Sequence, residues 1–326
     1  MDDKSAFSER ANAPALETTE HAAFIERVAR YVSEGRCVLF VGPDSGESDS
    51  RFQGLPTSGQ LADEMATAVA YRGRYVSFPQ MAQVFEERRG RQALIQFLRA
   101  RIHAPALRPL PLHRDIARLP FRVIISGGWD SLLAEALREQ RVPFDLLRPT
   151  WQAAVDETRV LLYQPHGNLT TFDDPGDLVI TQTDQAEVLS RPKFQGLLDR
   201  LKVALRERPL LLIGYAPAPG DLFVRLYEAI RLSQREFTPP AFAVQSLGRE
   251  DDIAAFETNG IAVITQEPGA FLRELAEAVA ALRGQPFDLI EPAQMSDAPR
   301  LTVDELTRQG AALDNIMNQI GIATLV

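Results

Sequence analysis

The chain has 326 residues, of which 45% are hydrophobic and 24% are charged. This length allows a sizeable buried core in one large domain or two. The formal net charge of −9 argues against a dominant nucleic-acid surface, because such surfaces need a basic stripe. The one cysteine, Cys37, excludes an internal disulfide and a cysteine-based zinc ribbon.

Residues 1–18 are polar and lack a clear period, so we predict a flexible tail there. No apolar run of the chain approaches membrane-spanning length, and no basic segment followed by an apolar stretch opens it. We therefore expect a cytoplasmic protein that makes no contact with a membrane.

The first core elements are a helix from Glu20 to Gly35 and the apolar strand Cys37–Val41, which ends at Gly42. A helix over 59–71, with Ser58 as its N-cap, and one longer helix over 78–102 follow this strand. These helices predict an all-helical insert over about 58–118.

Short apolar strands then alternate with helical patterns up to residue 283, which predicts a parallel sheet covered on both faces. The fold class is thus α/β, a Rossmann-like doubly wound parallel sheet with an inserted helical module, over residues 19–283. The strands are predicted at 121–126, 142–147, 160–163, 209–214, 241–245 and 261–265, and the helices at 131–140, 194–206, 221–232, 251–259 and 268–283.

Residues 284–300 contain three prolines and read as a linker. Residues 301–326 follow it with apolar residues at helical spacing, which predicts a C-terminal helical extension. Such a helix must pack on the core, on a second copy of the chain or on another protein.

The turn after the first strand contains Gly42, Ser45 and Gly46. A strand that ends in such a turn can offer backbone N–H groups to a phosphate. The spacing GxGxxG of dinucleotide-binding folds is absent, and an ordinary connection between a strand and a helix has the same appearance.

Six segments with matching order and spacing make the chain resemble the bacterial sirtuin-like family, in its divergent branch from anti-phage defence, over residues 20–283. The resemblance implies a Rossmann-type sheet with a helical insert, NAD as ligand or substrate, and, in many members, cleavage of the nicotinamide–ribose bond that depletes NAD. The six segments are FVGPDSG, LPTSGQLADEM, ISGGWDSLLAEAL, LYQPHGNL, LVITQTD and LLLIGYAPAPGDLFVRLYEAI.

The resemblance implies two catalytic residues. His166 matches the family's general base, a role that suits an imidazole because it titrates near neutral pH. Asp130 matches an aspartate beside the nicotinamide, although an aspartate before Ser131 is also an ordinary helix cap.

The implied nucleotide-binding residues depart from the family pattern at three places. Pro43 and Asp44 remove a backbone donor and add negative charge to the diphosphate loop, Gly128 replaces the family's Asn, and Ala216 replaces a Ser. Asp221 matches an acidic position but is also a candidate helix cap. The implied set is Gly42, Ser45, Gly46, Ser126, Gly128, Gly214, Tyr215, Asp221 and Gln245.

Two main hypotheses follow from this resemblance. In the first, the protein is a divergent or catalytically degenerate member of a defence system that acts through nucleotide binding and assembly, as an oligomer or with a partner protein held by Leu301–Val326. In the second, it is an active NAD hydrolase in which Ser126 or Asn168 replaces the Asn. A nucleotide sensor that binds without cleaving is a third possibility. A zinc-dependent deacetylase is excluded because one cysteine cannot supply a four-cysteine site, and we predict no bound metal.

Overall fold

The computed structural model describes residues 18–43, 55–75, 77–102, 108–149, 156, 158–170, 174–215, 221–234, 237–246 and 250–284. The predicted tail lies outside these residues except for Thr18, and the linker lies outside them except for Gly284. The predicted C-terminal helix over 301–326 is wholly outside them, so its packing stays a prediction.

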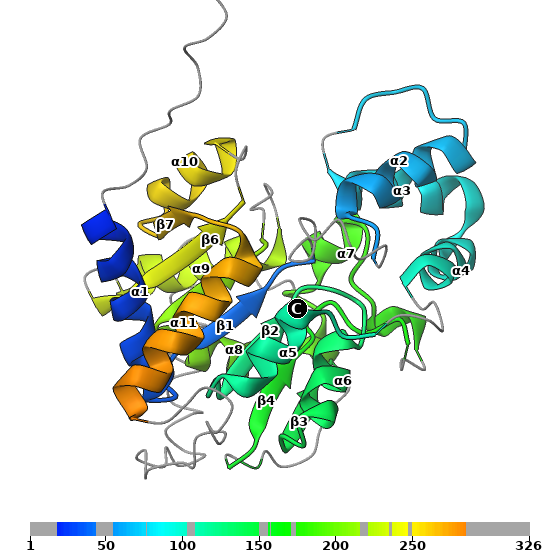
Figure 1. Cartoon of the computed structure of the whole chain (residues 1–326). Coiled ribbons are helices and arrows are strands. Elements are labelled where there is room, and N and C mark those ends of the chain that lie inside the picture. The colour runs from blue at the N-terminus through cyan, green and yellow to red at the C-terminus, as the bar shows by residue number, and fades with distance from the viewer. Residues whose placement is uncertain are drawn as a thin grey trace, which may run out of the picture.

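Within the described residues, seven parallel strands form one sheet in the order β3-β4-β2-β1-β5-β6-β7. Strand β1 is central, and the chain extends the sheet first on the β2 side and then on the β5 side, which confirms the Rossmann-like doubly wound prediction (Figure 1). The strands are β1 (Val38–Val41), β2 (Val123–Ser126), β3 (Phe144–Leu147), β4 (Val160–Tyr163), β5 (Leu210–Ile213), β6 (Ala241–Gln245) and β7 (Ala262–Thr265).

Helices cover both faces of this sheet (Figure 1). One face carries α1 (Thr18–Ser33), α5 (Pro111–Arg118), α6 (Leu132–Glu139) and α11 (Pro268–Arg283). The opposite face carries α8 (Pro192–Glu207), α9 (Leu222–Gln234) and α10 (Glu250–Thr258).

Strand β1 shows why the apolar runs become central strands. Leu39 and Val41 pack into the core on the α1 side, whereas Val38 and Phe40 pack into the core on the α8 side. All four side chains are buried. A strand with helices on both faces must be apolar at every position, because neither face meets water.

The helical module consists of α2 (Ser58–Ala68), α3 (Phe78–Arg89) and α4 (Arg91–Ile102) and has an apolar core of its own. It stands beside the sheet rather than on one of its faces (Figure 1). Helix α5, also within the predicted insert of about 58–118, packs instead on α6 and α11.

Two local predictions in the module are wrong. The single helix over 78–102 is two helices, because Gly90 adopts a φ of +85° that only glycine reaches without strain. The N-cap of α2 is Thr57, whose side chain accepts the backbone N–H of Gln60, and Ser58 is the first helical residue. The Gln60 side chain in turn accepts the N–H of Thr57 and completes a capping box.

Among the residues that the structure describes, none of the helices is both long and apolar enough to cross a membrane.

Candidate functional site

The carboxyl ends of the strands carry a series of hydrogen bonds that runs from the loop after β4 through β2 and β1 to β5. His166 after β4 bonds Gly127 after β2, and the N–H of Gly127 donates to the carbonyl of Val41 in β1 (3.0 and 2.8 Å). The N–H of Gly42 then donates to Ile213 in β5 (2.8 Å). Most of the predicted site residues therefore lie along one edge, where open α/β sheets bind ligands.

Among the predicted site residues that the structure describes, His166 has a buried side-chain polar atom without a hydrogen-bond partner. It is 8% exposed, and its Nδ1 lies 3.0 Å from the carbonyl oxygen of Gly127. A carbonyl only accepts, so Nδ1 carries the hydrogen and the Nε2 of the neutral ring is an acceptor. Nε2 is buried and has no hydrogen-bond partner among the described residues.

Asp130 caps a helix, which was one of its two predicted roles. Its Oδ1 accepts the N–H of Leu132 at the start of α6 (2.8 Å). The carboxylate also comes close to Gly128, since a Cβ there would lie 2.6 Å from Oδ2. Among the described residues, no hydrogen bond or ion pair joins the side chains of Asp130 and His166.

Trp129, in the loop after β2, packs into the apolar core of the helical module. Its indole N–H donates to the carbonyl of Val179 (3.2 Å), and its ring centroid lies 5.2 Å from that of Phe78 in α3. The same ring lies 6.3 Å from the imidazole of His166. Trp129 therefore forms an apolar wall on one side of the histidine.

Asn168 is a structural amide in this arrangement. Its Nδ2 donates to the carbonyl of Asp130 and to Oε1 of Gln164 (both 2.9 Å), and its Oδ1 accepts the N–H and hydroxyl of Thr170 (2.8 and 2.6 Å). Gln164, 1% exposed, also donates to the carbonyl of Asp130. These bonds join the loops after β2 and β4 and engage both ends of the Asn168 amide.

Gly42 and Gly214 permit the close approach of β1 to β5. A Cβ at Gly42 would lie 2.0 Å from the Gly214 carbonyl oxygen, and Gly214 has a φ of +61°. The first glycine of the predicted phosphate turn is thus required for backbone packing. The next predicted members, Ser45 and Gly46, lie outside the described residues.

The predicted residues after β5 and β6 form a second linked group. The hydroxyl of Tyr215 donates to Oδ1 of Asp221 (2.7 Å), which also accepts the N–H of Phe223 and so caps α9. Gln245, 2% exposed, donates through Nε2 to the carbonyl of Tyr215 (2.5 Å). Burial, with the nearby Asp221 charge, raises the pKa of Tyr215 well above its ordinary value, so the phenol stays protonated.

His113 is a buried titratable residue that the sequence interpretation did not identify. It lies in α5, and its Nδ1 accepts the backbone N–H of Leu110 (3.1 Å). Burial lowers its pKa, the Asp130 charge opposes this shift, and Arg114 adds to it. A histidine at the third position of a helix gives no sequence signal of such proximity to Asp130.

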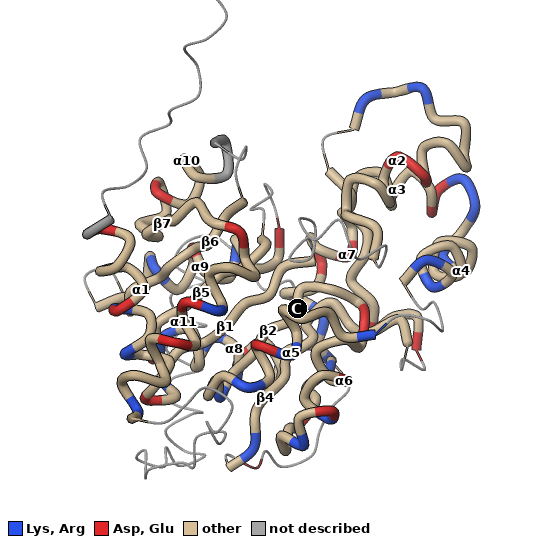
Figure 2. The backbone as a smooth tube through the Cα atoms, in the orientation of Figure 1, with Lys and Arg blue, Asp and Glu red and all other residues tan. Residues whose placement is uncertain are grey.

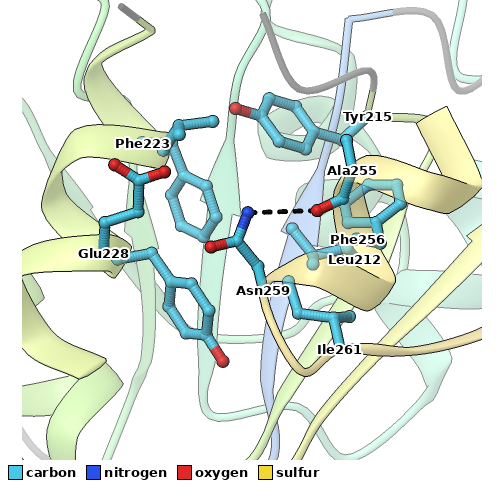
Figure 3. A pocket seen from close by; sticks show the side chains of 10 residues that line it. Leu212, Tyr215, Phe223, Glu228, Ala255, Phe256, Asn259 and Ile261 are labelled. Carbon is cyan, nitrogen blue, oxygen red and sulfur yellow. Dashed lines mark hydrogen bonds between the residues drawn. The ribbon is translucent and has the colours of Figure 1, made fainter. Parts of the chain in front are cut away.

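A small pocket lies between α9 and α10 (Figure 3). Its space of about 280 Å³, which includes open solvent, is lined largely by core side chains such as Phe223, Phe256 and Leu212. Figure 3 shows the amide of Asn259 donating to the carbonyl of Ala255 (3.0 Å). Tyr215 is the one predicted site residue in its lining, so this pocket is separate from His166.

The described residues contain no group of three or more His, Cys, Asp or Glu side chains arranged to hold a metal ion. Ser126, the last residue of β2, is buried next to Gly127.

A central parallel sheet, with polar loops gathered at its carboxyl edge, defines a Rossmann-like α/β protein. Residues 122–264 match the family model of the SIR2-like domain, a stretch that runs from β2 into β7 and contains Asp130, His166 and Gln245. Over this stretch the chain is similar to SIR2-like domains.

A solved structure described as "Structural Basis for the Mechanism and Regulation of Sir2 Enzymes" aligns with a TM-score of 0.46 and 14% sequence identity. The alignment covers 80% of this chain and 99% of that one. No curated protein matches the chain significantly.

Proposed function

We propose that the protein binds NAD or an ADP-ribose-like nucleotide along the carboxyl edge of the sheet, between the loops that follow β4 and β5. The observation that carries this proposal is the buried Nε2 of His166, an acceptor without a partner among the described residues. A buried acceptor without a hydrogen bond is costly, and a hydroxyl donor from a bound ligand removes that cost. Ribose supplies such hydroxyls.

The family resemblance and the position of the edge support a nucleotide over other hydroxyl-bearing ligands. The edge lies at the point where the strand order reverses around β1, which is where doubly wound folds bind nucleotides. The match of residues 122–264 to SIR2-like domains supports the same class of ligand.

The residues of the site support binding of the nucleotide better than they support its cleavage. Gly128 has no side chain to replace the amide of the family's Asn. Asn168, the nearest substitute that we predicted, uses both ends of its amide to join the loops. We therefore propose a divergent sirtuin-like protein that binds the nucleotide and turns it over slowly or not at all.

One observation favours NAD hydrolysis as the second candidate function. His166 has the tautomer of a general base, because Nδ1 donates to Gly127 and leaves the Nε2 lone pair free to take a proton. In that reaction water attacks the anomeric carbon of the ribose, the bond to nicotinamide breaks, and His166 accepts the proton directly or through a ribose hydroxyl.

We expect His166→Asn to weaken binding of ADP-ribose about tenfold, the loss of one buried hydrogen bond. Asn can keep the bond to Gly127 through its amide nitrogen but lacks an atom at the position of Nε2. Calorimetric titration of the parent and the variant measures the change, and nicotinamide release from NAD at high protein concentration tests turnover. Equal affinities would remove His166 from the site, and no binding by the parent would contradict the proposal.

We also propose that the protein works in the cytoplasm within a prokaryotic anti-phage defence system, as an oligomer or with a partner protein, through Leu301–Val326. The apolar stripe of this segment supports an interface role. The assignment to defence rests on the resemblance to the divergent sirtuin-like branch.

Charge placed in this stripe is expected to dissociate an oligomer. Ile316→Asp in the full-length chain puts a carboxylate on the predicted apolar face and should reduce the mass in solution to that of one chain, 36.2 kDa. Light scattering coupled to gel filtration measures the mass. Asn318→Asp adds the same charge on the predicted polar face and should leave the mass unchanged. A parent that is already monomeric would exclude self-association.

A further inference from the structure

Arg91, the first residue of α4, contacts Leu178 and Asp184, which lie outside the helical module in the chain that follows His166. Its guanidinium donates to the carbonyl of Leu178 and to Oδ2 of Asp184 (both 2.7 Å). It also donates to Glu86 at the end of α3 (2.9 Å). One side chain thus joins α3 and α4 to the chain between β4 and α8.

A second arginine of α4, Arg99, contacts the chain between β4 and α8 at a residue nearer to His166. Arg99 donates through Nε to the carbonyl of Leu169 (3.0 Å). The N–H of Leu169 donates to the carbonyl of Trp129 (2.8 Å), so this point is also tied to the loop after β2. Leu169, Leu178 and Trp129 all belong to the apolar core of the module.

The backbone of His166 is held close to the two carbonyl groups that the arginines bind, those of Leu169 and Leu178. Its carbonyl accepts the N–H of Val179 (3.0 Å), the residue next to the Leu178 carbonyl that Arg91 holds. Gly167 follows with a φ of +80°, and a Cβ there would lie 2.6 Å from the carbonyl oxygen of Asp177. A displacement of residues 177–179 must therefore move His166.

The position of Arg91 has no explanation within its own helix. A positive charge in the first turn of a helix opposes the macrodipole, and the first turn of α4 contains no acidic residue. The carboxylate of Asp184, which lies outside the module, forms an ion pair with Arg91. The Asp184 side chain is 9% exposed and also accepts a hydrogen bond from Arg191. Figure 2 shows Lys and Arg positions in blue where α3 ends and α4 begins.

We propose that α4 positions the nucleotide-binding histidine: Arg99 holds Leu169 and Arg91 holds residues 178–184, and through these contacts both arginines keep the Nε2 of His166 in the orientation that binds the ligand. This inference rests on the proposed function. It makes the helical module a control element, because a partner that moves α4 alters the site without touching the ligand.

The test is a double-mutant cycle on ADP-ribose affinity with Arg91→Gln and His166→Asn. Arg91→Gln alone should weaken binding about tenfold, within the range of coupling through a packed network. In the His166→Asn background the same substitution should have little further effect, because the group through which Arg91 acts is gone. Equal losses in both backgrounds would overturn the proposal.

A readout without ligand separates this inference from the proposed function. Nitrogen NMR of the four histidines in the ligand-free protein reports the tautomer of His166, assigned from its loss in His166→Asn. Arg91→Gln and Arg99→Gln should each shift the His166 signals away from the Nδ1–H form, even if no nucleotide binds. Unchanged signals in both variants would overturn the proposal.

Arg101 provides the matched control on the same helix. It pairs with Glu64 inside the module and lies over the ring of Phe97, at 3.7 Å from the centroid. Arg101→Gln should leave the His166 signals and the ADP-ribose affinity unchanged. If Arg91→Gln does not fold, Arg91→Lys keeps the charge with fewer donors and should give a smaller shift of the same sign.

Discussion

Replacement of Gly42 by alanine is expected to lower the free energy of unfolding by about 3 kcal/mol, the upper part of the usual range for overpacking. The new Cβ would lie 2.0 Å from the carbonyl oxygen of Gly214 and 2.6 Å from the Cα of Tyr215. Both obstacles are backbone atoms of a buried strand end, so no side-chain rotation relieves the contact. The hydrogen bond from Gly42 to Ile213 must lengthen as β1 and β5 separate.

Urea unfolding of the parent and Gly42→Ala measures this change, and the yield of soluble protein serves where the variant does not fold. Gly196→Ala is the matched control, because Gly196 lies inside α8 and a Cβ there meets nothing within 4 Å. That substitution should stabilise the protein by about 0.5–1 kcal/mol, since alanine favours a helix more than glycine does. An unfolding midpoint for Gly42→Ala equal to that of the parent would contradict the packing role.

The sheet was predictable because its strands have a simple signal. Runs such as Leu210–Ile213 are apolar at every position, and helices on both faces of the sheet require that composition. The break at Gly90 was not predictable from periodicity, because the apolar positions of α3 and α4 continue at helical spacing on both sides of it. One backbone angle decides between one helix and two.

The site was predictable in its location and less so in the roles of its side chains. Strand ends of a parallel sheet share one edge, so His166, Gly42 and Gly214 had to gather there. Whether an amide such as that of Asn168 is free for a ligand depends on neighbours far along the chain, here Asp130. The contacts of Arg91 could not be predicted from the sequence either, because Asp184 lies 93 residues away along the chain.

Asp184→Asn is expected to lower the free energy of unfolding at pH 7 by about 3 kcal/mol, the typical cost of removing one partner from a buried ion pair. The carboxylate accepts the N–H groups of Ile180 and Thr181 and pairs with Arg91 and Arg191. Burial alone would raise the pKa of Asp184, but these N–H donors and the Arg91 guanidinium hold it below its ordinary value of 3.8.

A lowered pKa in the folded protein means that folding favours the ionised carboxylate. This contribution is complete above the ordinary pKa of 3.8, which the unfolded chain keeps, and is lost as the pH falls through the lower folded value. Urea unfolding at pH 7, 5 and 3 should therefore show a constant difference between the parent and Asp184→Asn down to about pH 4 and a smaller one below it. Asp199→Asn, at an exposed site beside Lys202, should change stability by less than about 0.5 kcal/mol. A difference that persists unchanged at pH 3 would mean that the shape of Asp184, and not its charge, joins the module to the segment between β4 and α8.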